Sequence, residues 1–477
     1  MEYEAVIGLE VHAQLKTASK IFCGCSATYG AVPNTHVCPI CLGLPGILPA
    51  LNKKAVEYAL MMALATRCHI SPESRFARKN YFYPDLPKGY QISQYESSLA
   101  EHGWIEIETE QGTKRIGLTR IHLEEDAGKS IHNDVEGLSY IDFNRCGVAL
   151  IEIVSEPAIS SSEEAVTYLK KLRSILRYLE ISDGNMEEGS FRCDANLSLR
   201  RKGLRALGTR TELKNINSFS HVHKALEYEI ERQLDILESG EEVIQETRLW
   251  KENEGKTLSM RSKEESHDYR YFPEPDLLPL VVDQRWLDEI RASLPELPDA
   301  KMKRFIDQYS LPRYDSEVLT SSRELADYFE LCVRETGDAK MVSNWIMGEV
   351  LRELKGDDRA IEDCPVTPSA LAELLKMIKD GIISLRIGKD VFKEMYREGK
   401  SAGRIVKDRG LIQISDEREI ALIVEQILRE NPDKVHEYRK GKWQLFGFFV
   451  GQVMEKTRLK ANPRLVNEIL RRALGKQ

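Results

Sequence analysis

Phe191-Arg-Cys-Asp-Ala-Asn-Leu-Ser-Leu-Arg200 alternates apolar and polar residues without a break. Successive side chains of a β-strand point to opposite faces, so this stretch predicts a strand with one face on a core and a polar opposite face. Segments 120–126, 140–145 and 148–154 are further strand candidates. We therefore expect a sheet with one polar face at the centre of the fold.

Helices interleave with these strands. Ser161-Ser162-Glu163-Glu164 has the pattern of a capping box and predicts a helix that runs to about Leu179. A second helix is predicted over 221–238, ending before Ser239-Gly240. The strands are grouped and lack a strict strand–helix–strand rhythm, which favours an antiparallel α+β domain.

Strand patterns disappear beyond Leu294-Pro-Glu-Leu-Pro298, which reads as a linker, and Gly399-Lys-Ser-Ala-Gly403 is a second candidate linker. We therefore expect an α+β domain at 1–293, an all-α domain at 294–402 and a small α-helical tail at 403–477. In the tail, the glycine-spaced apolar segment 441–451 and the segment 465–474 are predicted helices.

Charge is distributed unevenly along the chain. Residues 439–477 contain ten Lys or Arg and two acids, a net charge of +8, although the whole chain carries −8. A basic end on an acidic body suggests that the tail holds a polyanion. An ordinary solvated helix face would produce the same charges.

Cysteine usage and hydropathy indicate the compartment. The nine cysteines are an odd number and five of them are scattered, which fits a reducing cytosol better than a secreted disulfide framework. The acidic start Met1-Glu2-Tyr3-Glu4 resembles no signal peptide. The longest stretch without Asp, Glu, Lys or Arg, 21–52, is interrupted by prolines, glycines and polar residues and lacks the continuous run of ~20 apolar residues that a membrane span needs. We expect a cytoplasmic protein with no membrane partner.

Cys23-Gly24-Cys25 and Cys38-Pro39-Ile40-Cys41 form two close thiol pairs separated by a short loop. Four thiolates can enclose one zinc ion tetrahedrally at ~2.3 Å per sulfur and leave no open position. The spacing therefore predicts a structural zinc knuckle at 23–41. The alternative is a set of buried thiols without an ion.

Acidic residues recur on the predicted strands. Glu10 and His12 share one strand face, and the other candidates are Glu124-Glu125-Asp126, Asp142, Asn144, Glu152, Glu156 and Glu187-Glu188. A surface sheet carries an occasional carboxylate without any function. Carboxylates on strands that otherwise look buried are costly unless they bind cations or pair with bases. Together they suggest a site for Mg²⁺ and nucleotide phosphates.

Basic residues Arg192, Arg200, Arg210 and Lys214 lie nearby in the sequence and could hold a triphosphate. No Walker loop supplies this function, because Leu123 stands where the motif ending in Gly128-Lys129-Ser130 needs glycine. Any nucleotide is therefore expected on the sheet.

The segment 78–94 combines aromatic, basic and amide side chains between prolines. It is either a packed irregular loop or a loop that lines the substrate site.

Six long motifs resemble the B-subunit family of the aspartyl/glutamyl-tRNA amidotransferases, and the resemblance covers essentially the whole chain. They are Ile7-Gly-Leu-Glu-Val-His12, the knuckle through Cys41-Leu-Gly-Leu-Pro-Gly46, segment 78–94, Ile121-His-Leu-Glu-Glu-Asp-Ala-Gly-Lys129, Thr211-Glu-Leu-Lys-Asn-Ile-Asn-Ser218 and His267-Asp-Tyr-Arg-Tyr-Phe-Pro-Glu-Pro-Asp276. The archaeal E-type sibling carries a large inserted domain for which this chain has no room.

The resemblance implies a cradle domain with a glutamine synthetase-like antiparallel sheet, an all-α domain and a YqeY-like tail. It implies that ATP phosphorylates the side-chain carboxylate of Glu-tRNA(Gln) or Asp-tRNA(Asn), and that ammonia then displaces the phosphate. The ammonia would come from a partner amidase (glutaminase) subunit, and a third, small subunit would complete the heterotrimer. The chain itself has no Ser-Ser-Lys amidase signature.

The resemblance also implies roles for individual residues. His12, Glu125 and Glu152 are the expected Mg²⁺ ligands, followed by Glu10 and Glu124; Arg192, Glu212 and Lys214 would contact nucleotide or phosphate; Lys79, Tyr81 and Lys88 would line the ammonia route. The helical and tail domains would bind tRNA, although 458–460 departs from the glycine-rich stretch common in the family.

Two other functions stay open from the sequence. One is a zinc-knuckle tRNA-binding scaffold without chemistry of its own, which would leave the buried carboxylates unexplained. The other is a free-standing ligase of the glutamine synthetase type that acts on a small amino acid.

Overall fold

The computed structural model describes residues 3–133, 137–262, 268–411, 416–457 and 461–475. Two features singled out in the sequence, His267 in the sixth motif and the stretch 458–460, lie outside these residues. The chain divides into two compact units, Met1–Pro298 and Asp299–Gln477.

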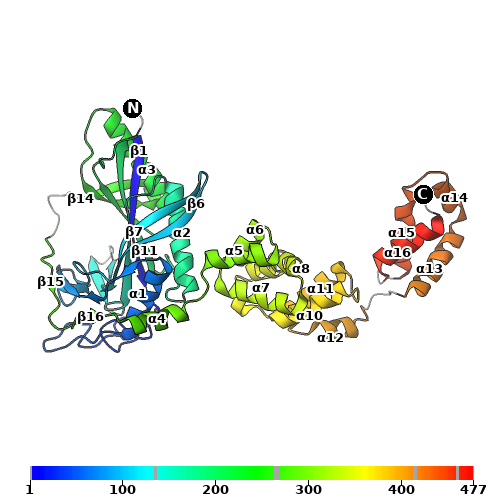
Figure 1. Ribbon diagram of the computed structural model, residues 1–477, viewed down its shortest axis with the longest axis horizontal. Helices are drawn as coiled ribbons and strands as arrows, with labels where there is room; N and C mark the ends of the chain where they lie inside the picture. Colours follow the sequence, from blue (N-terminus) through cyan, green and yellow to red (C-terminus); the bar gives the residue numbers. More distant parts are fainter. Residues whose placement is uncertain (1–2, 134–136, 263–267, 412–415, 458–460, 476–477) are drawn as a thin grey trace. The chain divides into compact units, whose positions relative to one another are not determined.

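A nine-stranded sheet forms the centre of the first unit (Figure 1). Its order is β14 (Lys256–Ser262), β13 (Glu246–Lys251), β12 (Thr211–Ile216), β11 (Phe191–Arg201), β1 (Tyr3–Gln14), β10 (Ala149–Ser155), β7 (Gly112–Glu125), β6 (Ala100–Thr109) and β2 (His69–Ile70). The alternating stretch 191–200 is β11, which pairs with β1 along almost its whole length. The predicted α+β class is confirmed.

One pair of strands departs from the antiparallel pattern. β12 and β13 run parallel, with Glu212 opposite Thr247, whereas every other neighbouring pair among the described strands is antiparallel. Helix α3 (Phe219–Glu238) connects the two strands and returns the chain to the same end of the sheet, as a parallel crossover requires.

The predicted helices begin at their capping residues. Helix α2 (Ser162–Tyr178) starts after Ser161, whose side chain accepts a hydrogen bond from the backbone N–H of Glu164. Helix α3 starts after Ser218 in the same way, so it begins two residues before the predicted start at 221. A side-chain oxygen at this position satisfies one of the free N–H groups of the first turn.

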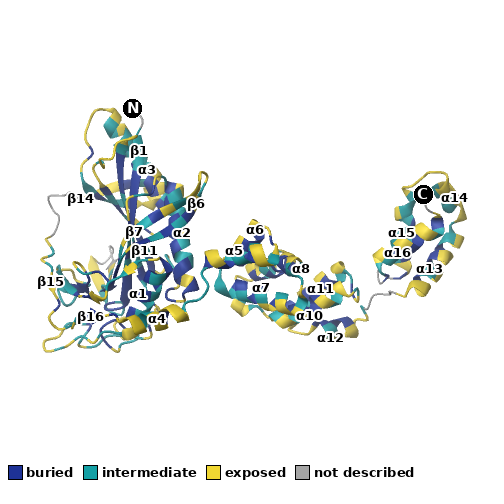
Figure 2. Ribbon diagram, in the orientation of Figure 1, coloured by how far each residue is buried: buried dark blue, intermediate teal, exposed yellow. Residues whose placement is uncertain are grey.

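Helices α1 (Lys53–Ala65), α2 and α3 pack against the sheet and bury its apolar face. Odd-numbered residues such as Val11 on β1, Ile151 on β10 and Cys193 on β11 are buried there. Figure 2 shows this burial as dark blue on β1 and α2. Even-numbered residues of the same strands therefore point away from the core.

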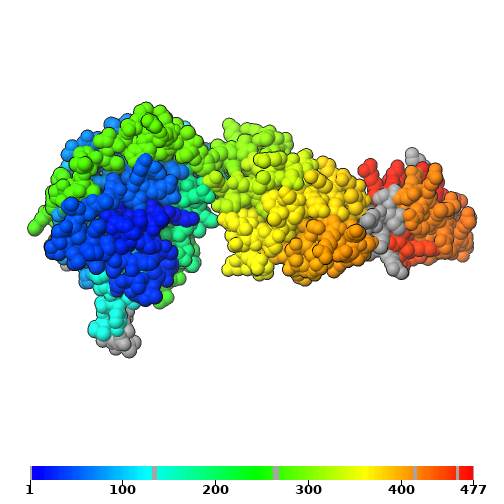
Figure 3. Space-filling model, turned by 90° about the horizontal axis from the view of Figure 1, so that it is seen from below, coloured from blue at the N-terminus to red at the C-terminus, as the bar shows by residue number. Residues whose placement is uncertain are grey.

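Short strands add three small sheets. These are β3 (Glu73–Ser74) with β16 (Leu280–Val281), β15 (Phe272–Pro273) with β4 (Ala77–Asn80) and β5 (Tyr90–Ser93), and β8 (Lys129–Asn133) with β9 (Leu138–Asp142). The β8–β9 hairpin is the cyan projection in Figure 3. The predicted strand 140–145 therefore ends early, at Asp142, and belongs to this hairpin and not to the large sheet.

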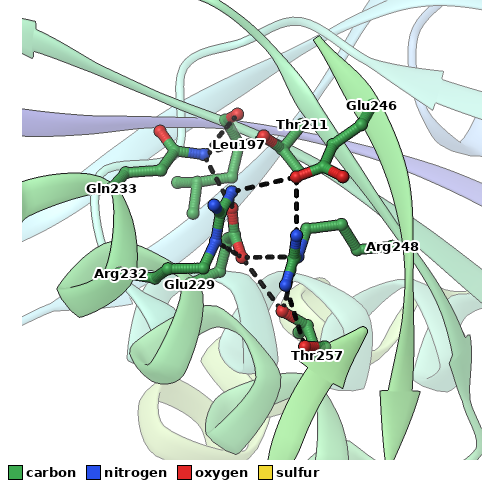
Figure 4. A network of polar contacts seen from close by, with 8 residues as sticks. All are labelled: Leu197, Thr211, Glu229, Arg232, Gln233, Glu246, Arg248 and Thr257. Carbon is green, nitrogen blue, oxygen red and sulfur yellow. Dashed lines mark hydrogen bonds and ion pairs between the residues drawn. The ribbon is translucent and has the colours of Figure 1, made fainter. Parts of the chain in front are cut away.

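A buried polar network ties α3 to the far edge of the sheet (Figure 4). The fully buried carboxylate of Glu229 accepts two hydrogen bonds from Arg232, at 2.6 and 2.9 Å, and one from Thr257 at 3.2 Å. Arg248 on β13 donates to Glu246 at 2.6 Å and to Thr257 at 2.8 Å. The network therefore holds β13 and β14 against α3.

The second unit is helical in its described part. Helix α4 (Gln284–Ser293) still belongs to the first unit, and the second contains α5 (Pro298–Tyr309), α6 (Arg313–Leu319), α7 (Arg323–Thr336), α8 (Ala339–Trp345), a π-helical turn (Ile346–Val350), α9 (Leu351–Gly356), α10 (Pro368–Lys379), α11 (Leu385–Glu398), α12 (Ala402–Asp408), α13 (Glu417–Glu430), α14 (Pro432–Arg439), α15 (Leu445–Lys456) and α16 (Pro463–Leu474). Single 3₁₀ turns occur at Glu252–Glu254 and Ile361–Asp363. Within the described ranges, no helix is long and apolar enough to cross a membrane.

Two separate apolar cores lie within this helical unit. One extends from Phe305 to Val406 and the other from Ile420 to Leu474. The expected tail start at 403 falls inside α12, whose Ile405 and Val406 belong to the first core. We therefore propose that the tail begins between Leu411 and Asp416.

Candidate active site

Cross-strand register brings the polar residues of distant segments together. His12 on β1 lies opposite Glu152 on β10 and opposite Arg192 on β11, and Glu152 in turn lies opposite His122 on β7. All four residue numbers are even, so the side chains share the face that the helices leave uncovered.

His12, Glu124 and Glu152 form the tightest cluster on this face. Nε2 of His12 lies 3.4 Å from Oε1 of Glu124 and 3.4 Å from Oε2 of Glu152. Their ligand atoms all lie within 4.8 Å of one another. Two carboxylates and one imidazole are a donor set that can hold a hard divalent cation together with water or phosphate oxygens.

Electrostatics in the cluster matches a cation site. Burial opposes a charge on His12, but the hydrogen bond to Glu152 and the charge of Glu124 outweigh it and raise the pKa of His12 to about 9. Burial also opposes a charge on Glu152, yet His122 and His12 hold its pKa well below the usual value. A cation that bound at Nε2 of His12 would have to displace this proton.

His122 belongs to the same cluster, although the sequence motifs did not single it out. Its Nε2 lies 3.2 Å from Oε2 of Glu152, and its side chain is buried. Among the described residues, Nδ1 of His122 and the nearby Nε of Arg120 are buried polar atoms without a hydrogen-bond partner. The alternation Arg120, His122, Glu124 along β7 was the signal that could have identified it.

Glu125 does not join the cluster, although the resemblance implied that it binds metal beside His12 and Glu152. It follows Ile121 and Leu123 on the core side of β7. There its carboxylate pairs with Lys88 and accepts a hydrogen bond of 2.8 Å from the backbone N–H of Ile92. Alternation along the strand is the cause, and it leaves Glu124 as the residue that faces His12.

Glu10 lies one step along β1 from the cluster. Its carboxylate accepts a hydrogen bond of 2.8 Å from the amide of Asn196, and burial together with the charge of Glu152 raises the pKa of Glu10.

The other polar candidates named from the sequence lie away from the cluster. Asp142 and Asn144 accept hydrogen bonds from the backbone of the knuckle loop, and Glu156, Glu187 and Glu188 are exposed.

The predicted phosphate contacts lie on the neighbouring strands of the polar face. Arg192 reaches Asp126 at 3.0 Å, and Lys214 lies 2.6 Å from Asp194 and 3.0 Å from Glu212. Burial opposes the charge of Lys214, but Asp194 and Glu212 outweigh it and raise its pKa above the usual value. Both cations are thus held in place by carboxylates at one side of the cluster.

The segment 78–94 approaches the cluster from the opposite side, across β7. Nζ of Lys79 lies 4.8 Å from the ring centroid of Tyr269 and 5.8 Å from that of Tyr81. Burial, and then the charge of Glu124, raises the pKa of Tyr81 above its usual value, which places this phenol within electrostatic range of the cluster. Lys88 is buried against Glu125 beside a cavity lined by Phe22, Cys23, Cys41 and Ile92.

The four knuckle thiols also come together, with all sulfur atoms within 4.8 Å of one another. Sγ of Cys41 accepts a hydrogen bond of 3.2 Å from the backbone N–H of Cys38 and lies 3.7 Å from Nζ of the fully buried Lys20. The hydrogen bond from Cys23 is the main influence that lowers the pKa of Cys41 to about 5. Four convergent thiols, one of them readily ionised, suit zinc.

Comparison with known proteins gives the family. Residues 5–288 match the model of the GatB/GatE catalytic domain, and residues 327–474 match that of the GatB domain. The chain is 59% identical over 478 residues to the B subunit of the aspartyl/glutamyl-tRNA(Asn/Gln) amidotransferase of Geotalea uraniireducens, covering all of both chains. It is 58% identical over 470 residues to the corresponding protein of Thermodesulfovibrio yellowstonii, covering 98% of this chain and 99% of that one.

These matches extend over the strands that carry His12, Glu124 and Glu152 and over the helical unit. The resemblance seen in the sequence motifs is thereby confirmed along the whole chain. The chain belongs to the family of aspartyl/glutamyl-tRNA(Asn/Gln) amidotransferase B subunits.

Proposed function

We propose that the chain catalyses the amidation step of a tRNA-dependent amidotransferase. The side-chain carboxylate of Glu-tRNA(Gln) or Asp-tRNA(Asn) attacks the γ-phosphorus of ATP, giving an acyl phosphate and ADP. Ammonia then attacks the acyl carbon, and phosphate leaves. The observation that supports this most strongly is the His12–Glu124–Glu152 cluster with Arg192 and Lys214 on adjoining strands.

Each group on the polar face has a task in this reaction. His12, Glu124 and Glu152 would hold Mg²⁺, which supplies positive charge against the phosphate oxygens. Arg192 and Lys214 are held by Asp126 and Asp194, and phosphate oxygens can replace these carboxylates as their partners. Glu212 keeps Lys214 oriented and accepts a hydrogen bond of 2.7 Å from Thr247.

Ammonia would arrive from a partner amidase, and we propose Lys79, Tyr81 and Lys88 as its route. The buried Lys88–Glu125 pair supplies polar groups on the core side of β7, and Tyr81, whose ring lies 5.8 Å from Nζ of Lys79, is within electrostatic range of Glu124. The amidase and the small third subunit of the complex are the proposed partners.

The proposed location of the protein is the cytoplasm. All nine cysteines lie in the described part of the chain and none forms a disulfide, which supports a reducing compartment.

Zinc in the knuckle would be structural, because four thiols leave no position open for a substrate. The likeness of the cradle to the glutamine synthetase sheet stays a prediction.

A tRNA-binding scaffold without chemistry gains no support from the structure. A scaffold function gives no reason for two carboxylates and two histidines to converge on a largely buried site.

The decisive experiment measures ATP cleavage by the assembled enzyme with and without Glu-tRNA(Gln). We expect cleavage only when the aminoacylated tRNA is present. Cleavage with free glutamate alone would indicate a free-standing ligase, and absence of cleavage under every condition would indicate a scaffold.

A further inference from the structure

Tyr95 and Tyr271 form a stacked pair of rings. Their centroids lie 3.9 Å apart and their planes differ by 5°. Tyr95 follows β5, and Tyr271 directly precedes β15, where Tyr269 packs edge-on against it at 6.1 Å. Tyr95 remains 48% exposed, so the stack is not part of a core.

The stack forms a wall of an open cavity of about 90 Å³. Phe76 and Phe272 contribute apolar surface, Ser97 and Glu96 contribute hydrogen-bonding groups, and Arg75 contributes a cation. Apolar walls with a few polar groups are typical of a site for a small molecule or for one base of a larger ligand. The aromatic walls favour a flat, conjugated ligand.

The cavity adjoins the carboxylate cluster. Burial is the main cause that raises the pKa of Tyr271. The neighbouring Tyr269, Glu152, Tyr95 and Glu124 raise this pKa further. The Tyr271 phenol therefore lies within electrostatic range of both cluster carboxylates, Glu152 and Glu124. The strand before Tyr95 is anchored directly to β7. Oε1 of Gln94 accepts a hydrogen bond of 3.0 Å from the backbone N–H of Leu123, next to Glu124.

We propose that this cavity binds the 3′-terminal adenosine of the aminoacylated tRNA, with its base against the Tyr95–Tyr271 stack. The inference rests on the proposed function. The amino acid is esterified to the ribose of this nucleotide, so the base must lie near the groups that activate the carboxylate. Unpaired bases of RNA ends are commonly bound by stacking on aromatic side chains. Arg75, exposed at the rim beside Glu73, offers a cation to the RNA backbone.

ATP also carries adenine, but its phosphates are expected elsewhere. Arg192 and Lys214 lie on β11 and β12, on one side of the cluster, whereas the cavity lies beyond β7 on the other. The two adenine sources make separate predictions.

The test compares two tRNA(Gln) molecules with the assembled enzyme, one complete and one lacking only the terminal adenosine. Dissociation constants are measured for wild type, Tyr95→Leu and Tyr95→Phe. Stacking of one base corresponds to roughly 5- to 150-fold in affinity, so we expect the trimmed tRNA to bind wild type more weakly by a factor in this range. Tyr95→Phe should preserve the difference and Tyr95→Leu should abolish it.

Leucine keeps apolar bulk beside Tyr271, and an unchanged melting curve checks that the fold is intact. Equal wild-type affinity for complete and trimmed tRNA overturns the inference without any variant. A raised KM for ATP in Tyr95→Leu, with the tRNA difference retained, assigns the cavity to ATP and also overturns it. Failure of the proposed function would show differently, as wild-type enzyme that never cleaves ATP with Glu-tRNA(Gln).

Discussion

Two adjacent glutamates on β7 have opposite surroundings. Glu124 faces His12 and Glu152 on the polar side of the sheet, and Glu125 faces Lys88 on the core side. Their side chains are identical and their positions in the sequence adjacent, so only the strand alternation separates them. Their surroundings therefore favour metal binding for the first and a role in ammonia transfer for the second.

Glu124→Gln and Glu125→Gln should accordingly differ in effect. Removing a direct ligand is expected to lower both ATP cleavage and amidation by more than about 100-fold, because even outer-shell changes cost 10–100-fold. Glu125→Gln should lower glutamine-dependent amidation more than tRNA-dependent ATP cleavage. Both rates are measured on the assembled enzyme, and equal losses in the two variants would contradict the assignment.

Metal removal tests the knuckle. Cys41, whose pKa is lowered to about 5 chiefly by the hydrogen bond from Cys23, lies at the cavity beside Lys88. We expect about one zinc per chain in protein purified without chelator, and Cys41→Ser to lose it together with several degrees of thermal stability. Cys364→Ser is a matched control, since this partly buried thiol belongs to the helical unit. Folded, metal-free wild type would refute a structural zinc.

At the scale of elements, the sequence predicted those features that depend on local periodicity. The alternation over 191–200 identified β11, and the serine caps identified α2 and, within two residues, α3. The parallel pairing of β12 with β13 was not visible, because pairing depends on where the chain returns after α3 and not on composition. His122 was missed since a single histidine carries little signal until the strand partners are known.

The Glu229 network gives an element-scale prediction. Glu229→Ala would leave the partly buried guanidinium groups of Arg232 and Arg248 short of a carboxylate, and breaking a buried pair typically costs about 3–5 kcal/mol. We expect a lower melting temperature for the first unit. Glu231→Ala, on an exposed position of the same helix, should change it little. Similar melting curves for the two variants would show that the network contributes no stability.

Acid sensitivity is expected in the helical unit. Glu349 on the π-helical turn is buried and lies 2.8 Å from Lys389. Burial opposes its charge, but Lys389 and Arg352 outweigh it and lower its pKa. A lowered pKa contributes stability that is complete above the ordinary value near 4.5 and is lost as pH falls through the folded-state value.

Glu349→Gln should therefore make the thermal stability of this unit less dependent on pH below about 4.5. Melting curves of full-length wild type and variant between pH 3 and pH 7 measure this, with Glu362→Gln, an exposed residue, as the control. The same acid-induced loss in Glu349→Gln and wild type would rule out this glutamate as its source.

At the scale of the whole molecule, we propose that the first unit carries out the chemistry and that the second binds tRNA. The first carries the cluster, the proposed ammonia route and the cavity beside Tyr95. The second contains a separate core from Ile420 to Leu474 and the basic residues that follow Arg439. A substrate as large as tRNA can contact both, so affinity and chemistry should be separable by mutation.

Arg464 and Arg471 lie seven positions apart on α16, both exposed, and so share one face of that helix. If this face contacts the RNA backbone, removing both charges should weaken tRNA binding and make its salt dependence shallower. Each lost phosphate contact lowers the slope of log K against log salt by roughly 0.7–0.9.

Arg418→Ala with Arg429→Ala removes two exposed charges from α13 and should leave the slope unchanged. Because we propose that the aminoacyl end binds in the other unit, ATP cleavage at saturating Glu-tRNA(Gln) should persist in the α16 variant. A steep salt dependence retained in that variant would place the RNA-binding surface elsewhere.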